Sequence, residues 1–166
     1  MFRKMRRFGQ QLPQAEAESI LTGATSGVLA LLGDEDYPYA VPMSHVYSDG
    51  KLYFHSAPAG HKVDAARRGG KASFCVIASD DLLPEKLTTL YTSVIVFGRI
   101  RIVEDDAEKL SAIRLIGSRF APGHMDKGEA EIQESWNRLT LLALDIEHMT
   151  GKESRELMVS RRSHDS

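Results

Sequence analysis

The stretch at residues 91–104, YTSVIVFGRIRIVE, constrains the fold more than any other part of the chain. Its β-branched and aromatic residues are typical of a strand. Residues 93–97 are apolar apart from Ser93, which predicts burial on both faces. From Arg99 onward polar and apolar residues alternate, so one face returns to solvent. Gly98 lies where the pattern changes and predicts a β-bulge.

A strand of this kind needs a sheet around it, and five further segments can supply one. Turn signals such as Ser48-Asp49-Gly50 join several of them in hairpin order. The expected strands lie at residues 27–32, 39–47, 51–56, 71–78 and 139–147, and the expected helices at 13–22, 61–68, 105–120 and 129–137. Residues 80–90 are expected to form a loop. The pattern predicts a mostly β (α+β) fold, a six-stranded antiparallel barrel with flanking helices.

The length of 166 residues suits one domain, which we place at residues 13–153. A basic N-terminal arm at residues 1–12 precedes it, and a C-terminal tail at residues 154–166 follows. The arm carries Arg3, Lys4, Arg6 and Arg7, but no apolar run follows them, so it does not read as a secretory signal. It is either a mobile arm or a basic contact to a partner chain or an anionic ligand.

Composition excludes several classes of protein. The formal net charge is −2, whereas a dedicated nucleic-acid-binding protein needs a basic excess. The single cysteine, Cys75, can form no internal disulfide and no multi-cysteine metal site. No apolar run reaches the roughly 18–20 residues of a membrane span. A reducing cytoplasm is the compartment we expect.

Residues 53–68 carry the clearest candidate binding site. A strand ends at His55-Ser56, a proline–glycine break follows, and a helix begins beside His61 and Lys62. A helix N-terminus offers free N–H groups and partial positive charge, which suit a phosphate. The Ser56 hydroxyl and the Lys62 ammonium would add to this cradle. The ordinary alternative is that Lys62 is only solvated.

Two other polar clusters are open to a functional and a structural interpretation. Pro42 disrupts strand pairing, so the backbone at residues 43–45 is free either for a ligand or simply as a protected sheet edge. The three hydroxyl residues at 91–93 enter the core and must find partners, which are solvent, backbone, or the polar edge of a bound ring.

Other chemistry finds little support. His45, His55 and His61 match no zinc spacing, and we expect no metal. Haem ligation by one of them is a minor alternative. The sequence contains no G-x-S-x-G elbow, no P-loop and no G-x-G-x-x-G fingerprint.

Four segments together resemble the FMN-binding split-barrel proteins related to pyridoxamine 5′-phosphate oxidase, nearest to the nitroimidazole-resistance (Nim) reductases. They lie at residues 37–47, 49–65, 91–105 and 146–153, and the likeness runs from about residue 23 to residue 153. The stretch ESWNRLTLLALDIE departs from the true oxidases, which carry an R-x-H-D-R-like run for the substrate phosphate. Oxidation of vitamin B6 is therefore not expected.

The resemblance implies a homodimer of split barrels with FMN in clefts at the subunit interface. It implies that the ribityl phosphate is contacted by residues of the helix start and that the ring is contacted by residues of two strands. The implied cofactor-binding residues are Met43, Ser44, His45, Val46, His55, Ser56, His61, Lys62, Tyr91, Thr92, Ser93 and Lys152. His55 would lie close to the flavin, and we take it as the candidate catalytic proton donor.

The expected function is an FMN-dependent oxidoreductase that passes electrons from NAD(P)H to a small acceptor such as a nitroaromatic compound. Two alternatives stay open. One is a flavin-binding protein without fast turnover, acting as a sensor or store. The other is a relative whose pocket holds haem or a deazaflavin.

Overall fold

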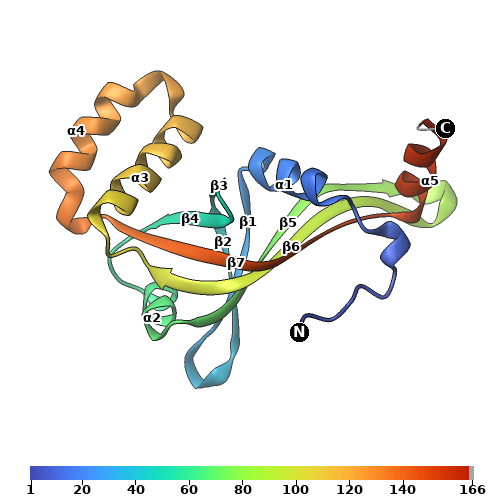
Figure 1. Cartoon of the computed structure of the whole chain (residues 1–166), viewed down its shortest axis with the longest axis horizontal. Coiled ribbons are helices and arrows are strands. Elements are labelled where there is room, and N and C mark those ends of the chain that lie inside the picture. The colour runs from blue at the N-terminus through green and yellow to red at the C-terminus, as the bar shows by residue number, and fades with distance from the viewer. Residues whose placement is uncertain (165–166) are drawn as a thin grey trace.

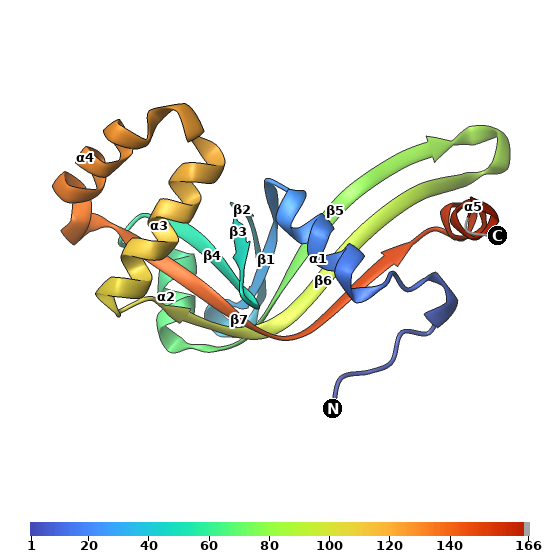
Figure 2. The same cartoon turned by 45° about the horizontal axis from the view of Figure 1, so that its top comes forward.

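The computed structural model describes residues 1–164 and forms one antiparallel sheet in the strand order β2-β1-β5-β6-β7-β4-β3 (Figures 1 and 2). The strands are β1 Ser26–Leu32, β2 Pro38–Ser44, β3 Val46–Ser48, β4 Lys51–Ser56, β5 Gly70–Leu83, β6 Thr88–Ile102 and β7 Thr140–Glu153. The mostly β fold predicted from the sequence is confirmed.

Helices pack around this sheet. The α-helices are α1 Gln14–Gly23, α2 His61–Arg68, α3 Asp106–Phe120, α4 Met125–Ser135 and α5 Arg155–His164. Short 3-10 turns lie at η1 Phe8–Gln10, η2 Asp34–Asp36, η3 Pro84–Lys86, η4 Pro122–His124 and η5 Trp136–Arg138. Helices α3 and α4 form a hairpin at one end of the molecule, beside β4 (Figure 1).

The expected count of six strands is wrong, because the segment at residues 39–47 is two strands. It breaks at His45, which separates β2 from β3. These two strands lie at opposite ends of the sheet order, so the sheet curls round and does not close. The buried His45 sits at the open seam, 1% exposed. The opening of the barrel therefore lies between β2 and β3, two strands that only His45 separates in the chain.

The loop expected at residues 80–90 is mostly strand. Pairing between β5 and β6 continues out to Leu83 opposite Thr88, so the two strands form a long hairpin beyond the barrel (Figure 2). Asp80 and Asp81 are charged residues within strand β5. They are tolerated because this ribbon is open to solvent on both faces, so neither charge is buried.

The bulge expected at Gly98 is present. The register of β6 against β7 shifts between Phe97 and Gly98. A Cβ atom at residue 98 would overlap the backbone carbonyl oxygen of Asp145, so the close approach of the two strands requires glycine.

The apolar interior has two parts. The larger part fills the curled sheet and includes the fully buried Phe54 and Phe74, whose ring centroids lie 5.2 Å apart. The smaller part lies between the sheet and α3 and includes Tyr53 and Ala112. Strand β4 contributes to both, so its end is held firmly on either side.

The segments outside the central sheet are attached to it. Gln11 forms an isolated bridge with Lys152, and the amide of Leu12 donates to the carbonyl of Gly151 at 3.0 Å. Most of the C-terminal tail at residues 154–166 is helix α5, which runs through residue 164; residues 165–166 lie outside the described residues. Within residues 1–164, no helix has the length and apolarity to span a membrane.

Candidate functional site

A cavity of ≈ 550 Å³ lies between β2, the end of β4, the start of α2 and helix α3. We call it the β4–α2 cavity. Its lining is formed by Pro42, Met43, Ser44, His55, Ser56, Ala57, Lys62, Ile116 and Phe120. Five of the twelve expected cofactor-binding residues therefore meet in one place: Met43, Ser44, His55, Ser56 and Lys62.

The β2 side of the cavity is a free strand edge. Strand β2 pairs with β1, where Pro42 lies opposite Val28, and it ends the sheet on its other side. Pro42 has no N–H to offer, which suits an edge position. Backbone groups of Met43 and Ser44 on the unpaired side therefore have no partner in the sheet.

Ser56, the last residue of β4, is the most informative residue of the cavity. Its side chain is 4% exposed, and its Oγ has no hydrogen-bond partner among the described residues. A buried hydroxyl without a partner costs about 1–3 kcal/mol. An acceptor supplied by a bound molecule in the cavity would remove that cost.

The start of α2 presents further unused donors. Gly60 precedes it with φ +124°, a conformation that favours glycine. The Gly60 carbonyl accepts from the amides of Val63 at 2.8 Å and Asp64 at 3.0 Å. The amides of His61 and Lys62 donate to no acceptor within residues 1–164. These two N–H groups and the helix dipole make the start of α2 suitable for holding an anion.

Arginine side chains hold this helix start in position. Arg67 donates to the carbonyl of Pro58 at 3.2 Å, which fixes the loop before α2. Arg68 bonds the carboxylate of Asp34 at 3.2 Å and the carbonyl of Leu32 at 3.3 Å. The Lys62 ammonium makes no ion pair with a described residue, so its charge is available to the cavity.

His55 lines the cavity, and its side chain is partly covered and partly open to solvent. Partial burial of its imidazole lowers its pKa below the usual 6.5, so the ring is mostly neutral at pH 7. A second cavity of ≈ 360 Å³ shares His55, Ser56 and Ala57 and extends toward the α3–α4 hairpin. The end of β4 therefore borders both cavities.

Helix α3 covers the β4–α2 cavity with Ile116 and Phe120. Its N-cap is Asp105, whose carboxylate accepts from the Glu108 amide at 2.7 Å. At its other end, Arg119 donates to the carbonyl of Gly23 at the end of α1. The helix is thus tied to the rest of the molecule near each terminus.

A polar network fixes the first turn of α3 to the sheet. Glu108 accepts from the hydroxyl of Tyr53 at 2.9 Å and from Arg101 at 2.7 Å, and Arg101 also bonds Asp145 at 2.8 Å. The Arg101 guanidinium holds the pKa of Glu108 below its usual range. Burial, with the hydrogen bond to Glu108, raises the pKa of Tyr53 to about 12. Glu108 therefore stays ionised and Tyr53 stays neutral at neutral pH.

Three of the expected cofactor-binding residues face elsewhere. His45 Nε2 lies 2.9 Å from the carbonyl of Leu21, and Val46 belongs to the smaller part of the core. The His61 ring stacks on Tyr39 at 4.0 Å between centroids and accepts from the Asp34 amide at 3.3 Å. Only the backbone amide of His61 points to the group of unused donors at the start of α2.

The other four expected residues do not line the β4–α2 cavity. Tyr91, Thr92 and Ser93 belong to β6, and Lys152 belongs to the neighbouring strand β7. Ser93 pairs with Lys152 and Thr92 with Glu153. The Lys152 ammonium lies 5.0 Å from the ring centroid of Tyr91. Ser93 and Lys152 line a separate cavity with the N-terminal arm.

The sequence did not identify Ile116 and Phe120 as part of the site. Both belong to the apolar stripe that predicted helix α3, with spacings of three and four residues. That stripe indicates that one face is buried, but periodicity alone does not tell which surface the helix covers.

A curled antiparallel sheet that does not close places the chain in the class of split-barrel proteins. Comparison with known families gives the family within that class. A family model described as pyridoxamine 5′-phosphate oxidase matches residues 13–153. The chain belongs to this family. A search of curated proteins found no match.

Solved structures share the fold. A putative 5-nitroimidazole antibiotic resistance protein from Bacteroides thetaiotaomicron superposes with a TM-score of 0.75 at 22% identity, covering 86% of each chain. An FAD- and haem-binding protein from Mycobacterium smegmatis gives a TM-score of 0.74 at 21% identity, covering 92% of this chain and 80% of that one. An FAD-binding protein from Mesorhizobium loti gives 0.57 at 26% identity, covering 87% and 96%.

Proposed function

We propose that this chain is a flavin-dependent oxidoreductase that binds FMN in the β4–α2 cavity. The observation that carries the proposal is the buried, unpartnered Oγ of Ser56 beside the free amides of α2. This donor set suits a phosphate. Membership in the pyridoxamine 5′-phosphate oxidase family and the flavin-binding descriptions of neighbours support a flavin as the molecule that carries this phosphate.

Each group of the cavity has a role in this proposal. Ser56, the His61 and Lys62 amides and the Lys62 ammonium would hold the ribityl phosphate. The free edge of β2 at Met43 and Ser44 would hydrogen-bond the polar edge of the ring. Helix α3 would exclude water from the apolar part of the cofactor through its two lining side chains.

Bound FMN would supply the redox chemistry, taking electrons from NAD(P)H and passing them to a small acceptor such as a nitroaromatic compound. The protein's task is to bind, orient and tune the cofactor. His55, which lines the cavity, would exchange a proton with the acceptor. Because its pKa is lowered, it accepts a proton at neutral pH more readily than it donates one.

We further propose that the chain acts as a homodimer. The outer face of the sheet exposes Val28, Ile77, Ile95 and Phe97, with exposed fractions of 42%, 67%, 38% and 40%. An apolar sheet face of this kind supports an interface between copies. A partner subunit packed there would give Tyr91, Thr92, Ser93 and Lys152 a route to the flavin that they lack within one subunit.

The proposal is tested by titrating the protein with FMN. Lys62→Ala should weaken FMN binding by about tenfold or more, since it removes the cation nearest the phosphate. Lys127→Ala, an exposed lysine on α4, is the matched control and should bind as the wild type does. Equal FMN affinity in the wild type and Lys62→Ala would contradict the phosphate assignment.

Turnover separates an enzyme from a flavin store. We expect the FMN-loaded protein to consume NAD(P)H steadily when a nitroaromatic acceptor is added. Consumption that stops after one equivalent per bound flavin would instead indicate a binding protein.

A further inference from the structure

The cavity of ≈ 360 Å³ that extends from the end of β4 toward the α3–α4 hairpin has no ligand assigned to it so far, and we call it the hairpin cavity. Its volume lies within the range typical of small-molecule sites. Its walls come from β4, α3, α4, the η5 turn and Leu139. None of its lining residues belongs to the apolar sheet face proposed as the subunit interface. The two surfaces are therefore separate parts of the molecule.

The hairpin cavity adjoins the β4–α2 cavity at the end of β4. His55, Ser56 and Ala57 line both cavities. Helix α3 covers both as well, with Ile113 over the hairpin cavity and Ile116 over the β4–α2 cavity. A small molecule in the hairpin cavity would therefore lie next to a flavin held in the β4–α2 cavity, and both molecules would border on His55.

One wall of the hairpin cavity is apolar. It is formed by Ile113 of α3, Ile132 of α4 and Leu139, each of which is half-buried. Ile113 and Leu139 also pack against the smaller part of the core, which holds them in place. Three aliphatic side chains from separate elements suit the face of a ring compound better than a fully polar ligand.

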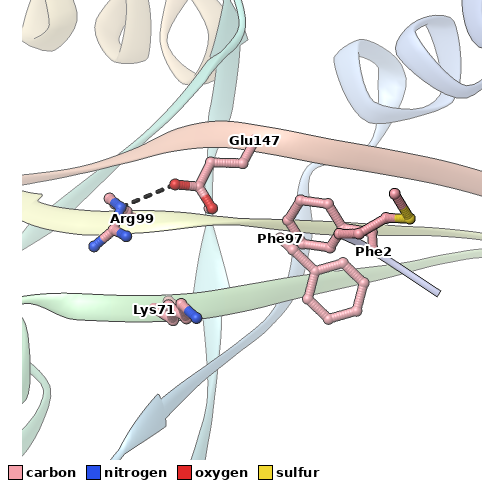
Figure 3. Close-up of a pocket in the computed structure, with 8 residues that line it drawn as sticks. Phe2, Lys71, Phe97, Arg99 and Glu147 are labelled. Carbon is pink, nitrogen blue, oxygen red and sulfur yellow. Dashed lines mark hydrogen bonds and ion pairs between the residues drawn. The ribbon is translucent and has the colours of Figure 1, made fainter.

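Arg138 is the cation of the hairpin cavity, and it differs from other arginines nearby and on the sheet. Arg114 of α3 bonds Glu129 at 2.7 Å, and Arg99 of β6 bonds Glu147 at 2.9 Å (Figure 3). The side chain of Arg138 is exposed and forms no ion pair or hydrogen bond within the part of the chain that the structure describes. Its charge is thus left for another molecule.

Neither the hairpin nor the carboxylate of the cavity requires Arg138. At the end of the hairpin the carbonyl of Trp136 accepts from the Lys109 ammonium at 3.0 Å, so a different cation already meets this terminus. Glu131 accepts from the hydroxyl of Ser135 at 3.2 Å and forms no ion pair with Arg138. A free guanidinium binds a carboxylate through two parallel hydrogen bonds. The hairpin cavity therefore combines an apolar wall with one free site for an anionic group.

We propose that the hairpin cavity binds the electron acceptor and that it selects a small ring compound with a carboxylate. The ring lies against Ile113, Ile132 and Leu139, the carboxylate meets Arg138, and the reducible group is directed toward His55. Arg138 is then the specificity-determining residue for the acceptor. The role of the bound compound as acceptor rests on the proposed function, whereas its binding does not.

The reaction of such an acceptor balances with the nicotinamide donor already proposed. Reduction of a nitro group to a nitroso group takes two electrons and two protons and releases one water. One NAD(P)H supplies the two electrons and one of the protons as hydride and becomes NAD(P)+, and the second proton comes from solvent.

The test is calorimetric titration of the FMN-saturated full chain with para-nitrobenzoate and with its neutral counterpart para-nitrobenzamide. Arg138→Gln should weaken binding of the acid by about tenfold and leave binding of the amide unchanged. Lys127→Gln removes an exposed cation elsewhere on α4 and should change neither affinity. Thermal melts establish that each variant is folded.

A second variant tests the apolar wall. Ile132→Ala should weaken binding of the acid and of the amide by similar factors, because both compounds carry the same ring. In steady-state kinetics, Arg138→Gln should raise KM for the acid with little change in kcat, since the carboxylate contact is the same before and during the reaction.

The proposal is overturned if the wild type binds neither compound or if Arg138→Gln binds the acid as the wild type does. It is also overturned if Lys62→Ala loses the acid and Arg138→Gln keeps it, because the acid would then lie in the β4–α2 cavity. A chain that binds the acid through Arg138 but consumes no NAD(P)H would refute the proposed function and uphold the binding site. If the chain takes up no FMN, the same titrations of the chain alone still decide which cavity holds the acid.

Discussion

Ser56 is the residue on which the site depends most closely. In the protein without ligand its Oγ has no partner, so Ser56→Ala should leave the melting temperature unchanged or raise it. The same change should weaken FMN binding by about tenfold, because a phosphate contact is lost. Thermal melts and FMN titrations of Ser56→Ala, with the exposed Ser111→Ala as control, measure both effects. A lower melting temperature with unchanged FMN affinity would show a purely structural role.

His45 predicts a pH dependence of stability. Burial lowers its pKa in the folded state, helped by the nearby charge of Arg119, and the hydrogen bond to Leu21 only partly opposes this. As pH falls below the unfolded value of about 6.5, the unfolded chain takes up the proton first, so the free energy of unfolding falls. Denaturant unfolding at pH 7 and pH 5 should show a smaller loss for His45→Gln than for the wild type. Equal losses would contradict this account.

At the residue scale, the features that suggested the candidate site are local in the sequence. Ser56 and Lys62 are brought together by one strand end, one loop and one helix start, all within a few residues of each other. The burial of His45 could not be predicted from neighbouring residues in the sequence. Its burial at the barrel seam depends on α1 and Phe74, which are distant in sequence.

At the element scale, the position of α3 rests on the network that joins Glu108 to the sheet. We expect a coupling energy of about 1 kcal/mol between Arg101 and Glu108, because both are partly exposed and solvent screens the pair. A double-mutant cycle with Arg101→Met and Glu108→Gln, read by denaturant unfolding, measures it. The pair Arg114–Glu129 lies on the exposed side of the hairpin and should give a smaller value. A coupling near zero for Arg101–Glu108 would remove the network as the support of α3.

The elements themselves were largely predictable where the pattern is local. The helix at residues 61–68 and the bulge at Gly98 are present as expected. The predicted number of strands was wrong because the hydrophobic pattern continues through His45. The separation of β2 from β3 at this residue results from tertiary packing. The extent of β5 and β6 was missed because an isolated ribbon tolerates polar residues that otherwise indicate a loop.

At the scale of the whole molecule, the homodimer is the next claim to test. Ile77→Glu places a charge on the most exposed residue of the apolar sheet face and should shift the protein toward monomer. Light scattering after size exclusion measures the mass, and an FMN titration of the same variant should show weaker binding. A monomeric wild type, or a dimer that persists in Ile77→Glu, would contradict the proposed interface.

The central claim is that the β4–α2 cavity holds a flavin phosphate. The most direct measurement is the absorption spectrum of the protein purified without added cofactor, followed by mass analysis of what denaturation releases. The account predicts a yellow protein with a band near about 450 nm and the mass of FMN, one per subunit. A colourless protein that takes up no added FMN at micromolar concentration would contradict it.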